Sequence, residues 1–255
     1  MTAVRDAVFE LSAVPGVRLA LPADDDELRA AQATWGVHLP DAHLELLQLT
    51  NGVIAEDGHN RFFGIGATAA IDMVEWNSEG CWKFAWHGRA DPYLCFGEDV
   101  WGNQYAYRFE DLRSTAPGPP LWFLGGIDLT PFSMQRQSFE EFLTYGFVRN
   151  AQGLVDNDDG RLTKERFPVL GADELLVPMP PGLLMGVDDQ SIPAMVDRAE
   201  VMSARVAMIV NGDVCTQLNE RLMGRLPDRF EVVEDEQGRT RLKLVWDDPR
   251  RSPFN

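Results

Sequence analysis

Regular spacing of apolar residues near the start of the chain predicts a short amphipathic helix. Leu28, Ala31 and Trp35 recur at intervals of three and four over residues 27–35, so one helix face can be buried. Three aspartates directly before this segment place negative charge at the positive end of the helix dipole. Gly36 follows, and glycine tolerates the left-handed conformation in which many helices end.

A second helix is predicted over residues 41–50, between two further breaks. Pro40 fixes φ and lacks an N–H group, which suits the beginning of a helix, and Asp41 offers a carboxylate as its cap. The leucines of this segment recur at helical spacing and form its apolar stripe. The pair Asn51-Gly52 then tolerates positive φ and ends the helix.

The middle of the chain alternates apolar and polar residues, which predicts antiparallel strands. Aromatic residues occupy every second position of residues 104–109, so one face of that strand is aromatic. Turn-forming residues at 97–103 separate it from the preceding strand and predict a hairpin. Strands are predicted at residues 61–65, 93–96, 104–109 and 119–124, and helices at residues 67–77 and after the capping residue Ser138.

The final hundred residues predict a separate, smaller region. Polar, turn-prone residues at 150–168 indicate a linker. The chain therefore divides into a domain over residues 1–150 and a C-terminal α+β extension over residues 165–255. In the extension, the pattern predicts a strand at 175–178, a helix over 214–223 capped by Asp213, and a hairpin around the turn at 236–238.

The charge of the chain separates classes of partner. There are 40 acidic residues against 23 Lys and Arg, a net charge of −17. The first 150 residues hold 21 acidic and 10 basic residues, so the acid is spread along the chain. Nucleic-acid binding needs basic surface and is disfavoured, whereas a basic protein partner would be attracted. Simple solubility is the alternative explanation of the same charge.

No segment predicts export or membrane insertion. No apolar run approaches the roughly 20 residues that span a bilayer. The charged first 21 residues lack the apolar core of a signal peptide. The three cysteines are widely spaced and cannot all be paired with one another, which fits a reducing compartment. We therefore expect a cytoplasmic protein.

Motifs of enzymes and cofactor sites are weak or absent. Residues 64–69 match G-x-G-x-x-A, but the tryptophan-rich residues 75–88 do not resemble the second parallel strand that a dinucleotide site needs. The four histidines form no metal-binding pair, and no nucleophile elbow occurs. The sequence therefore predicts no cofactor, no metal and no catalytic residues, and an enzyme is the least favoured class of function.

Several motifs over residues 24–148 resemble the SUKH superfamily, which includes yeast cell-wall-synthesis regulators and many bacterial immunity proteins. The resemblance implies an α+β fold in which a mixed or antiparallel sheet is flanked by helices, and it leaves the C-terminal hundred residues unassigned. The motifs are, in order, Trp35-Gly36, Leu39-Pro40, Asn51-Gly52, the aromatic-glycine segment 62–66, Phe96-Gly97, the segment 102–105 and the Ser138-Phe139-Glu140-Glu141 helix start.

The same resemblance implies a binding function. The leading hypothesis is a non-enzymatic immunity protein that neutralises a cognate bacterial polymorphic toxin through an acidic surface. The toxin would be a basic domain of nuclease or deaminase type. The alternative is a protein-binding adaptor or regulatory scaffold without a toxin partner, as the yeast members suggest.

The turn at residues 97–103 holds the candidate partner-binding residues Glu98, Asp99 and Trp101. An aromatic side chain flanked by carboxylates combines apolar burial with charge complementarity, which a binding anchor for a basic protein needs. Most tryptophans in this part of the chain are expected in the core. For Trp101 both roles stay open, because turns carry function more often than cores do.

Overall fold

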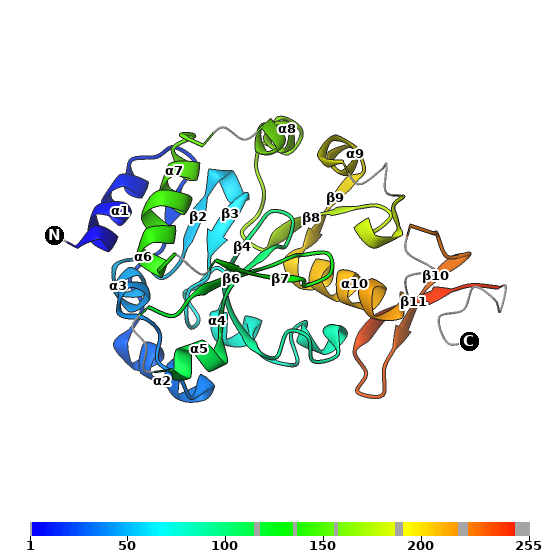
Figure 1. The fold of residues 1–255 in the computed structure, drawn as a ribbon, viewed down its shortest axis with the longest axis horizontal. Coiled ribbons are helices and arrows are strands. Elements are labelled where there is room, and N and C mark those ends of the chain that lie inside the picture. Colours follow the sequence, from blue (N-terminus) through cyan, green and yellow to red (C-terminus); the bar gives the residue numbers. More distant parts are fainter. Residues whose placement is uncertain are drawn as a thin grey trace.

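One antiparallel sheet organises the residues that the computed structural model describes, which are 2–114, 118–134, 137–155, 158–186, 191–218 and 224–247. Its seven strands follow one another in chain order, each antiparallel to the next (Figure 1). The fold is therefore α+β, as predicted, and the main sheet is antiparallel. The strands are β1 (Arg18–Leu19), β2 (Val53–Ala55), β3 (Asn60–Phe62), β4 (Tyr93–Asp99), β5 (Gln104–Arg108), β6 (Leu121–Leu124) and β7 (Pro131–Met134).

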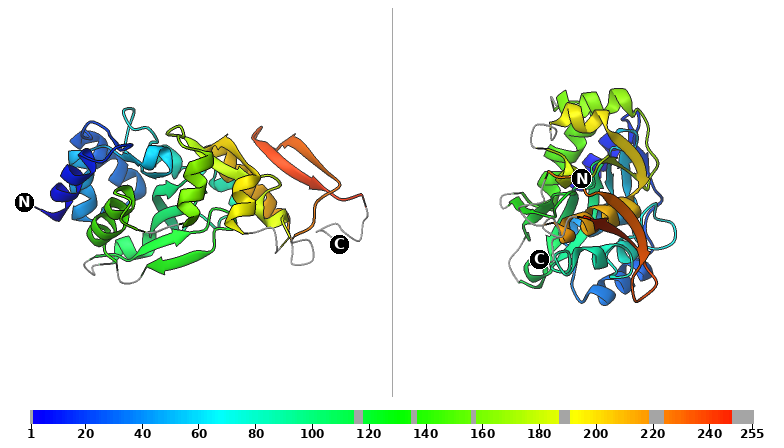
Figure 2. Two further views of the ribbon diagram at one scale, coloured as in Figure 1. Left: turned by 90° about the horizontal axis from the view of Figure 1, so that it is seen from above. Right: turned by 90° about the vertical axis from the view of Figure 1, so that its right-hand side faces the viewer.

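Helices cover both faces of this sheet, and the molecule is elongated, with α1 near one end and the hairpin β10–β11 at the other (Figures 1 and 2). The first part of the chain contributes α1 (Ala3–Ser12), α2 (Asp25–Trp35), α3 (Asp41–Leu49), α4 (Met73–Trp76), α5 (Phe109–Arg113) and α6 (Phe139–Glu141), which continues through a π-helical turn (Phe142–Phe147) into α7 (Val148–Ala151). The second part contributes α8 (Asp158–Arg166), β8 (Glu174–Pro178), α9 (Ile192–Asp197), β9 (Ala199–Ser203), α10 (Ala204–Gln217), β10 (Arg229–Glu234) and β11 (Thr240–Val245).

The predicted helix breaks lie where the sequence places them. The Asp24 carboxylate accepts hydrogen bonds from the backbone N–H groups of Asp26 and Glu27 at the start of α2. Gly36 ends α2 in the left-handed conformation, with φ of 64°. Asp41, in contrast, is not the cap of α3: the N-cap is Pro40, and no side chain caps that end. Ser138 forms a complete capping box with Glu141 at the start of α6.

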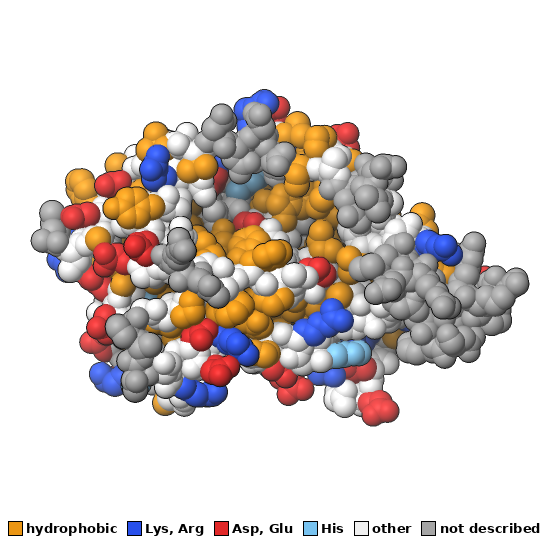
Figure 3. Space-filling model, viewed as in Figure 1, with side chains coloured by type: hydrophobic (Ala, Val, Ile, Leu, Met, Phe, Trp, Pro, Cys, Tyr) orange, Lys and Arg blue, Asp and Glu red, His pale blue; other side chains and the backbone are white. Residues whose placement is uncertain are grey.

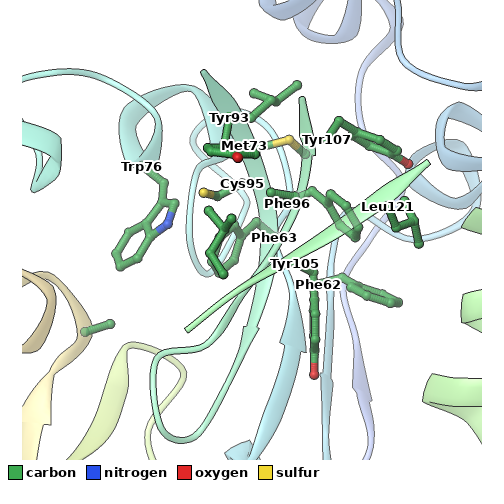
Figure 4. Packing of buried hydrophobic residues seen from close by; sticks show 14 of the residues in the cluster. Phe62, Phe63, Met73, Trp76, Tyr93, Cys95, Phe96, Tyr105, Tyr107 and Leu121 are labelled. Atoms are coloured by element: carbon green, nitrogen blue, oxygen red, sulfur yellow. The ribbon is translucent and has the colours of Figure 1, made fainter. Parts of the chain in front are cut away.

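Alternation along the strands separates two faces, shown in close-up in Figure 4. The face that we call the aromatic face packs against α3 and α6, with His43 stacked on Phe139 at 4.3 Å between ring centroids. The opposite face, which we call the α10 face, packs against α4, the turn Lys83–Trp86 and α10. Figure 4 places Phe62, Phe96, Tyr105 and Tyr107 on the aromatic face and Phe63, Cys95 and Trp76 on the other.

The C-terminal part of the chain packs directly on the α10 face. The indole N–H of Trp86 donates to the carbonyl of Met208 in α10, at 2.9 Å. Met208 is fully buried and belongs to the same hydrophobic cluster as the central strands. The division into two domains stays a prediction, and the structure adds that one apolar cluster includes residues from both segments.

Arg61 makes the polar connection between these two segments. It lies in β3 with 1% of its side chain exposed, and its Nε is 3.4 Å from Oε1 of the fully buried Glu98. Its guanidinium also donates to the backbone carbonyls of Ala172 and Glu174, just before and within β8. A charged group in the interior is tolerated only when it is paired and hydrogen-bonded. Arg61 therefore binds the sheet to the segment that precedes β8.

Three further expectations about helices were wrong. Residues 67–77 form a helix only at α4, because the Asn51 side chain bonds both the N–H and the C=O of Ile65 at 2.7 Å and holds the preceding segment as a loop. Asp213 lies inside α10 instead of capping a helix, and it accepts hydrogen bonds from Arg241 and Leu242 of β11. The expected linker at 150–168 contains the helix α8.

Removing the Arg61 guanidinium should destabilise the protein strongly. We expect Arg61→Met to lower the free energy of unfolding by about 3–5 kcal/mol, because the buried Glu98 carboxyl loses its partner and the carbonyls of Ala172 and Glu174 lose their buried donor. Urea denaturation measures the change. The matched control is Arg29→Met, which removes an exposed partner of Asp26 and should cost less than about 1 kcal/mol. Equal effects of the two substitutions would contradict the role given to Arg61.

The buried His43 should make the protein sensitive to acid. Burial lowers the pKa of His43 to about 3, below the value near 6.5 of an unfolded chain. The unfolded state then binds a proton that the folded state does not, so stability is full above pH 6.5 and is lost as the pH falls toward 3. We expect His43→Leu to reduce the slope of unfolding free energy between pH 6 and 4 by up to about 1.4 kcal/mol per unit. Urea titrations at each pH provide the slopes, and the exposed His38→Leu is the control that should leave them unchanged.

Candidate protein-binding hollow

Residues paired across the aromatic face become steadily more exposed toward β7. Directly opposed residues share a face, and Phe62, Gly97, Tyr105, Phe123 and Phe132 form one such row from β3 to β7. Phe62 is 3% exposed, whereas Phe132 is 60% exposed. The aromatic face is therefore covered at one end and open at the other.

The helical segment α6–α7 explains this gradient because it covers only part of the row. Phe147 stacks on Phe62 with ring centroids 4.0 Å apart, and Phe142 packs edge-on against Tyr105 at 4.9 Å. Beyond Tyr105, exposure rises: Phe123 is half-buried and Phe132 is largely exposed. Figure 3 shows hydrophobic side chains gathered over the central strands, around a hollow below α8.

This hollow, which we call the α8 hollow, is a cavity of about 830 Å³ between the sheet and the segment from α7 to α8. Asn60, Asp99 and Tyr105 reach it from the sheet. The pair Asn60 and Asp99 lies two residues along the strands from the pair Phe62 and Gly97, so it is on the same, aromatic face. Leu154 and Val155 lie at its opposite wall, 61% and 43% exposed. The hollow thus combines a polar floor with an apolar wall.

Asp99 has a defined set of hydrogen bonds in the floor. Its Oδ1 accepts the backbone N–H groups of Trp101 and Asn103, at 2.9 and 3.1 Å. Its Oδ2 accepts the side-chain amide of Asn103 at 2.7 Å. Burial raises the pKa of Asp99 to about 6, although these hydrogen bonds act in the opposite direction. The carboxylate is therefore held in place and is ionised at neutral pH.

Trp101 lines the same hollow and also contacts a small core. Its side chain is half-buried and packs against the apolar cluster that contains Val100, Leu170 and Leu176. The N–H of Leu176 donates to the carbonyl of Val100 at 2.8 Å, which joins the turn after β4 to β8. The C-terminal segment thus supports Trp101 from behind and leaves part of the indole at the cavity.

Glu98 points away from the hollow. It is fully buried on the α10 face, where it pairs with Arg61 and accepts a hydrogen bond from Gln104 at 2.7 Å. Burial raises the pKa of Glu98 to about 7, and the nearby guanidinium opposes that shift. Of the three predicted partner-binding residues, the structure brings Asp99 and Trp101 together at one cavity, and Glu98 faces the interior. Partner binding by these residues stays a prediction.

Strand period explains the position of Glu98. The sequence-based interpretation ended the strand at residue 96 and treated 97–103 as turn, but β4 continues to Asp99. Consecutive strand residues point to opposite faces, so Glu98 and Asp99 are separated. The contributions of Asn60, Tyr105 and Leu154 were missed, since their meeting depends on how the chain after α7 folds back over the sheet.

Charged side chains on the wall of the hollow occur in pairs. Lys164 of α8 forms an ion pair with Glu56, and Arg161 lies 2.6 Å from Glu165. His59 donates from Nε2 to the carbonyl of Phe167 at 2.7 Å, and burial lowers the pKa of His59. Among the described residues, no group of three His, Cys, Asp or Glu side chains is placed to hold a metal ion.

No helix in the described parts of the chain is long and apolar enough to cross a bilayer.

Comparison with protein-family models agrees with the motif order. Residues 22–145 match the model of the SMI1 / KNR4 family (SUKH-1). The chain also resembles the crystal structure of Atu4351 from Agrobacterium tumefaciens, with 9% identity and a TM-score of 0.46 over 90% of this chain and 94% of that one. A search of curated proteins found no match.

The antiparallel meander with helices on both faces defines an α+β domain. The match over residues 22–145 supports the assignment of this segment to the SUKH superfamily, as the motifs had indicated.

The gradient of exposure along the aromatic face can be tested by truncating its two ends. Phe62→Ala should lower the free energy of unfolding by about 3–5 kcal/mol, because it leaves a cavity in the core. Phe132→Ala should change it by less than about 1 kcal/mol, because most of that ring already contacts water. Chemical denaturation of both variants measures the difference. A large loss for Phe132→Ala would show that the β7 end is covered.

Proposed function

We propose that this protein is a non-enzymatic, cytoplasmic bacterial immunity protein that binds a cognate polymorphic toxin and neutralises it. Membership of residues 22–145 in SUKH-1 supports the class, because the superfamily includes immunity proteins. The proposed contact surface comprises the α8 hollow and the adjoining uncovered end of the aromatic row, which is formed by Phe123 and Phe132. Within it, Asp99 and Trp101 are the proposed contacts from the sequence-predicted turn, and Glu98 supports them from the interior.

The open end of the aromatic row is the observation that carries this proposal. Phe132, 60% exposed, and its half-buried neighbour Phe123 leave apolar area in water at the end of a row that begins in the core. Exposed apolar patches with a polar rim are typical of protein interaction sites. The hollow beside it adds a concave surface in which an anchoring side chain of a partner can be desolvated.

The charge of the chain supports a basic partner. The net charge of −17 is spread over both halves of the sequence, so a cationic toxin domain of nuclease or deaminase type would be attracted from a distance. We further propose that residues 1–150 form the SUKH domain proper. Residues 165–255 form an extension whose β8 segment supports Trp101 from behind.

Binding to the toxin domain encoded beside this gene should be tight and sensitive to salt. We expect the association rate to fall by about tenfold or more between 50 and 500 mM NaCl, with a smaller change in the dissociation rate, because long-range attraction is screened. Surface plasmon resonance with the purified domain measures both rates. Rescue of cells that express the toxin is the functional readout.

The control for this experiment is a toxin domain from an unrelated neighbourhood, which should neither bind nor be neutralised. Absence of any toxin gene beside this one, together with several housekeeping proteins captured and no rescue, would favour the adaptor alternative. Salt-independent binding to the toxin would contradict the electrostatic part of the proposal.

A further inference from the structure

The Asp99 carboxylate, which lines the α8 hollow, retains one acceptor position. A carboxylate has about four acceptor positions. Three are used by the hydrogen bonds from the N–H groups of Trp101 and Asn103 and from the Asn103 side chain. The first two bind Oδ1, so the remaining position is on Oδ2. The side chain cannot turn away without breaking the other three bonds.

Among the described residues that line the hollow, Asp99 is the carboxylate without an ion-pair partner. Glu56 pairs with Lys164, and Glu165 pairs with Arg161. Arg61, the other strong positive charge nearby, lies on the opposite face of the sheet with Glu98. The floor of the hollow therefore carries one negative charge with which none of the described lining side chains forms an ion pair.

Aromatic groups and a second acceptor surround this charge. The half-buried indole of Trp101 and the ring of Tyr105 both line the cavity. The Tyr105 hydroxyl donates to Oδ1 of Asn60 at 2.9 Å, so its oxygen lone pairs remain acceptors. The apolar side chains of Leu154 and Val155 form the wall opposite. Together, a carboxylate, a second oxygen acceptor and aromatic ring faces are the groups that bind a planar cation such as a guanidinium.

The geometry points to the α8 hollow as a receptor for one arginine side chain of the protein partner. Its guanidinium would donate to Oδ2 of Asp99 and lie against Trp101, and its aliphatic stem would contact Leu154 and Val155. This assignment rests on the proposed function, since it names the chemical group by which a basic partner is anchored. At about 830 Å³ the cavity has room for such a side chain together with water.

An apolar or anionic anchor fits less well. An apolar side chain in the floor would cover the remaining acceptor position of Asp99 without replacing its hydrogen bond to water, which is costly. An anion would meet an ionised carboxylate, because Asp99 has a pKa of about 6 and is charged at pH 7.5. A guanidinium satisfies both the charge and the acceptor.

Two small probes test the assignment on the full-length protein. N-acetyl-arginine amide and N-acetyl-citrulline amide have nearly the same shape, but only the first is charged. NMR titration at pH 7.5 follows the indole resonances, and Trp101→Phe assigns the signal of Trp101. We expect the arginine probe to bind at least about tenfold more tightly than the citrulline probe, because a charge-assisted hydrogen bond is lost in the second.

A matched pair of variants separates the site from general attraction to an acidic protein. Asp99→Asn should abolish the preference for the arginine probe, since it keeps the side-chain shape and removes the charge. Asp26→Asn changes the net charge equally at an exposed position of α2 and should retain the preference. Circular dichroism shows whether each variant is folded.

The result that would overturn the inference is equal binding of the two probes by the wild-type protein, which needs no variant. An equal loss of preference in both variants would also overturn it. These outcomes are independent of toxin binding, so the hollow can fail as an arginine site while the immunity function holds. If the toxin domain binds, Asp99→Asn should weaken that binding at least about tenfold, and Asp26→Asn should not.

Discussion

The contacts of the buried Arg61 guanidinium with Glu98 and with the segment before β8 are the interaction on which the architecture depends. The guanidinium lies on the α10 face of the central sheet, where it neutralises Glu98 and binds carbonyls of the segment leading into β8. Neither charge is stable in the interior without the other. The pair therefore fixes where the C-terminal part of the chain meets the main sheet, and it does so at the end of β4 where the hollow begins.

The two faces of the sheet have different roles because of this connection. On the α10 face, the row Arg61, Glu98, Gln104 and Leu124 is covered by the C-terminal segment and holds the molecule together. On the aromatic face, the corresponding row of opposed residues from Phe62 to Phe132 is covered only where α6 and the π-helical turn reach. The α10 face is buried along this row, whereas the aromatic face leaves apolar side chains accessible toward β7.

Local patterns in the sequence predicted many elements correctly. The aspartates before α2, Gly36 after it and the Ser138 capping box act through contacts within a few residues, so they need no tertiary information. Errors arose where a distant side chain decides. Asn51 holds residues near Ile65 as a loop, and β11 supplies the partners of Asp213. Two of the three predicted site residues, Asp99 and Trp101, meet at one cavity, whereas Glu98 lies in the core.

By itself the sequence determined the boundaries of α2, the start of α6, the antiparallel hairpins, the acidic charge and the family match of residues 22–145, because these depend on local chemistry and motif order. Only the tertiary structure decided which side of each strand is covered. Glu98 and Asp99 are neighbours with the same charge, yet one is buried and the other lines a hollow. The reason is that strand residues alternate between faces, and residues more than 70 positions away cover one face and leave part of the other open.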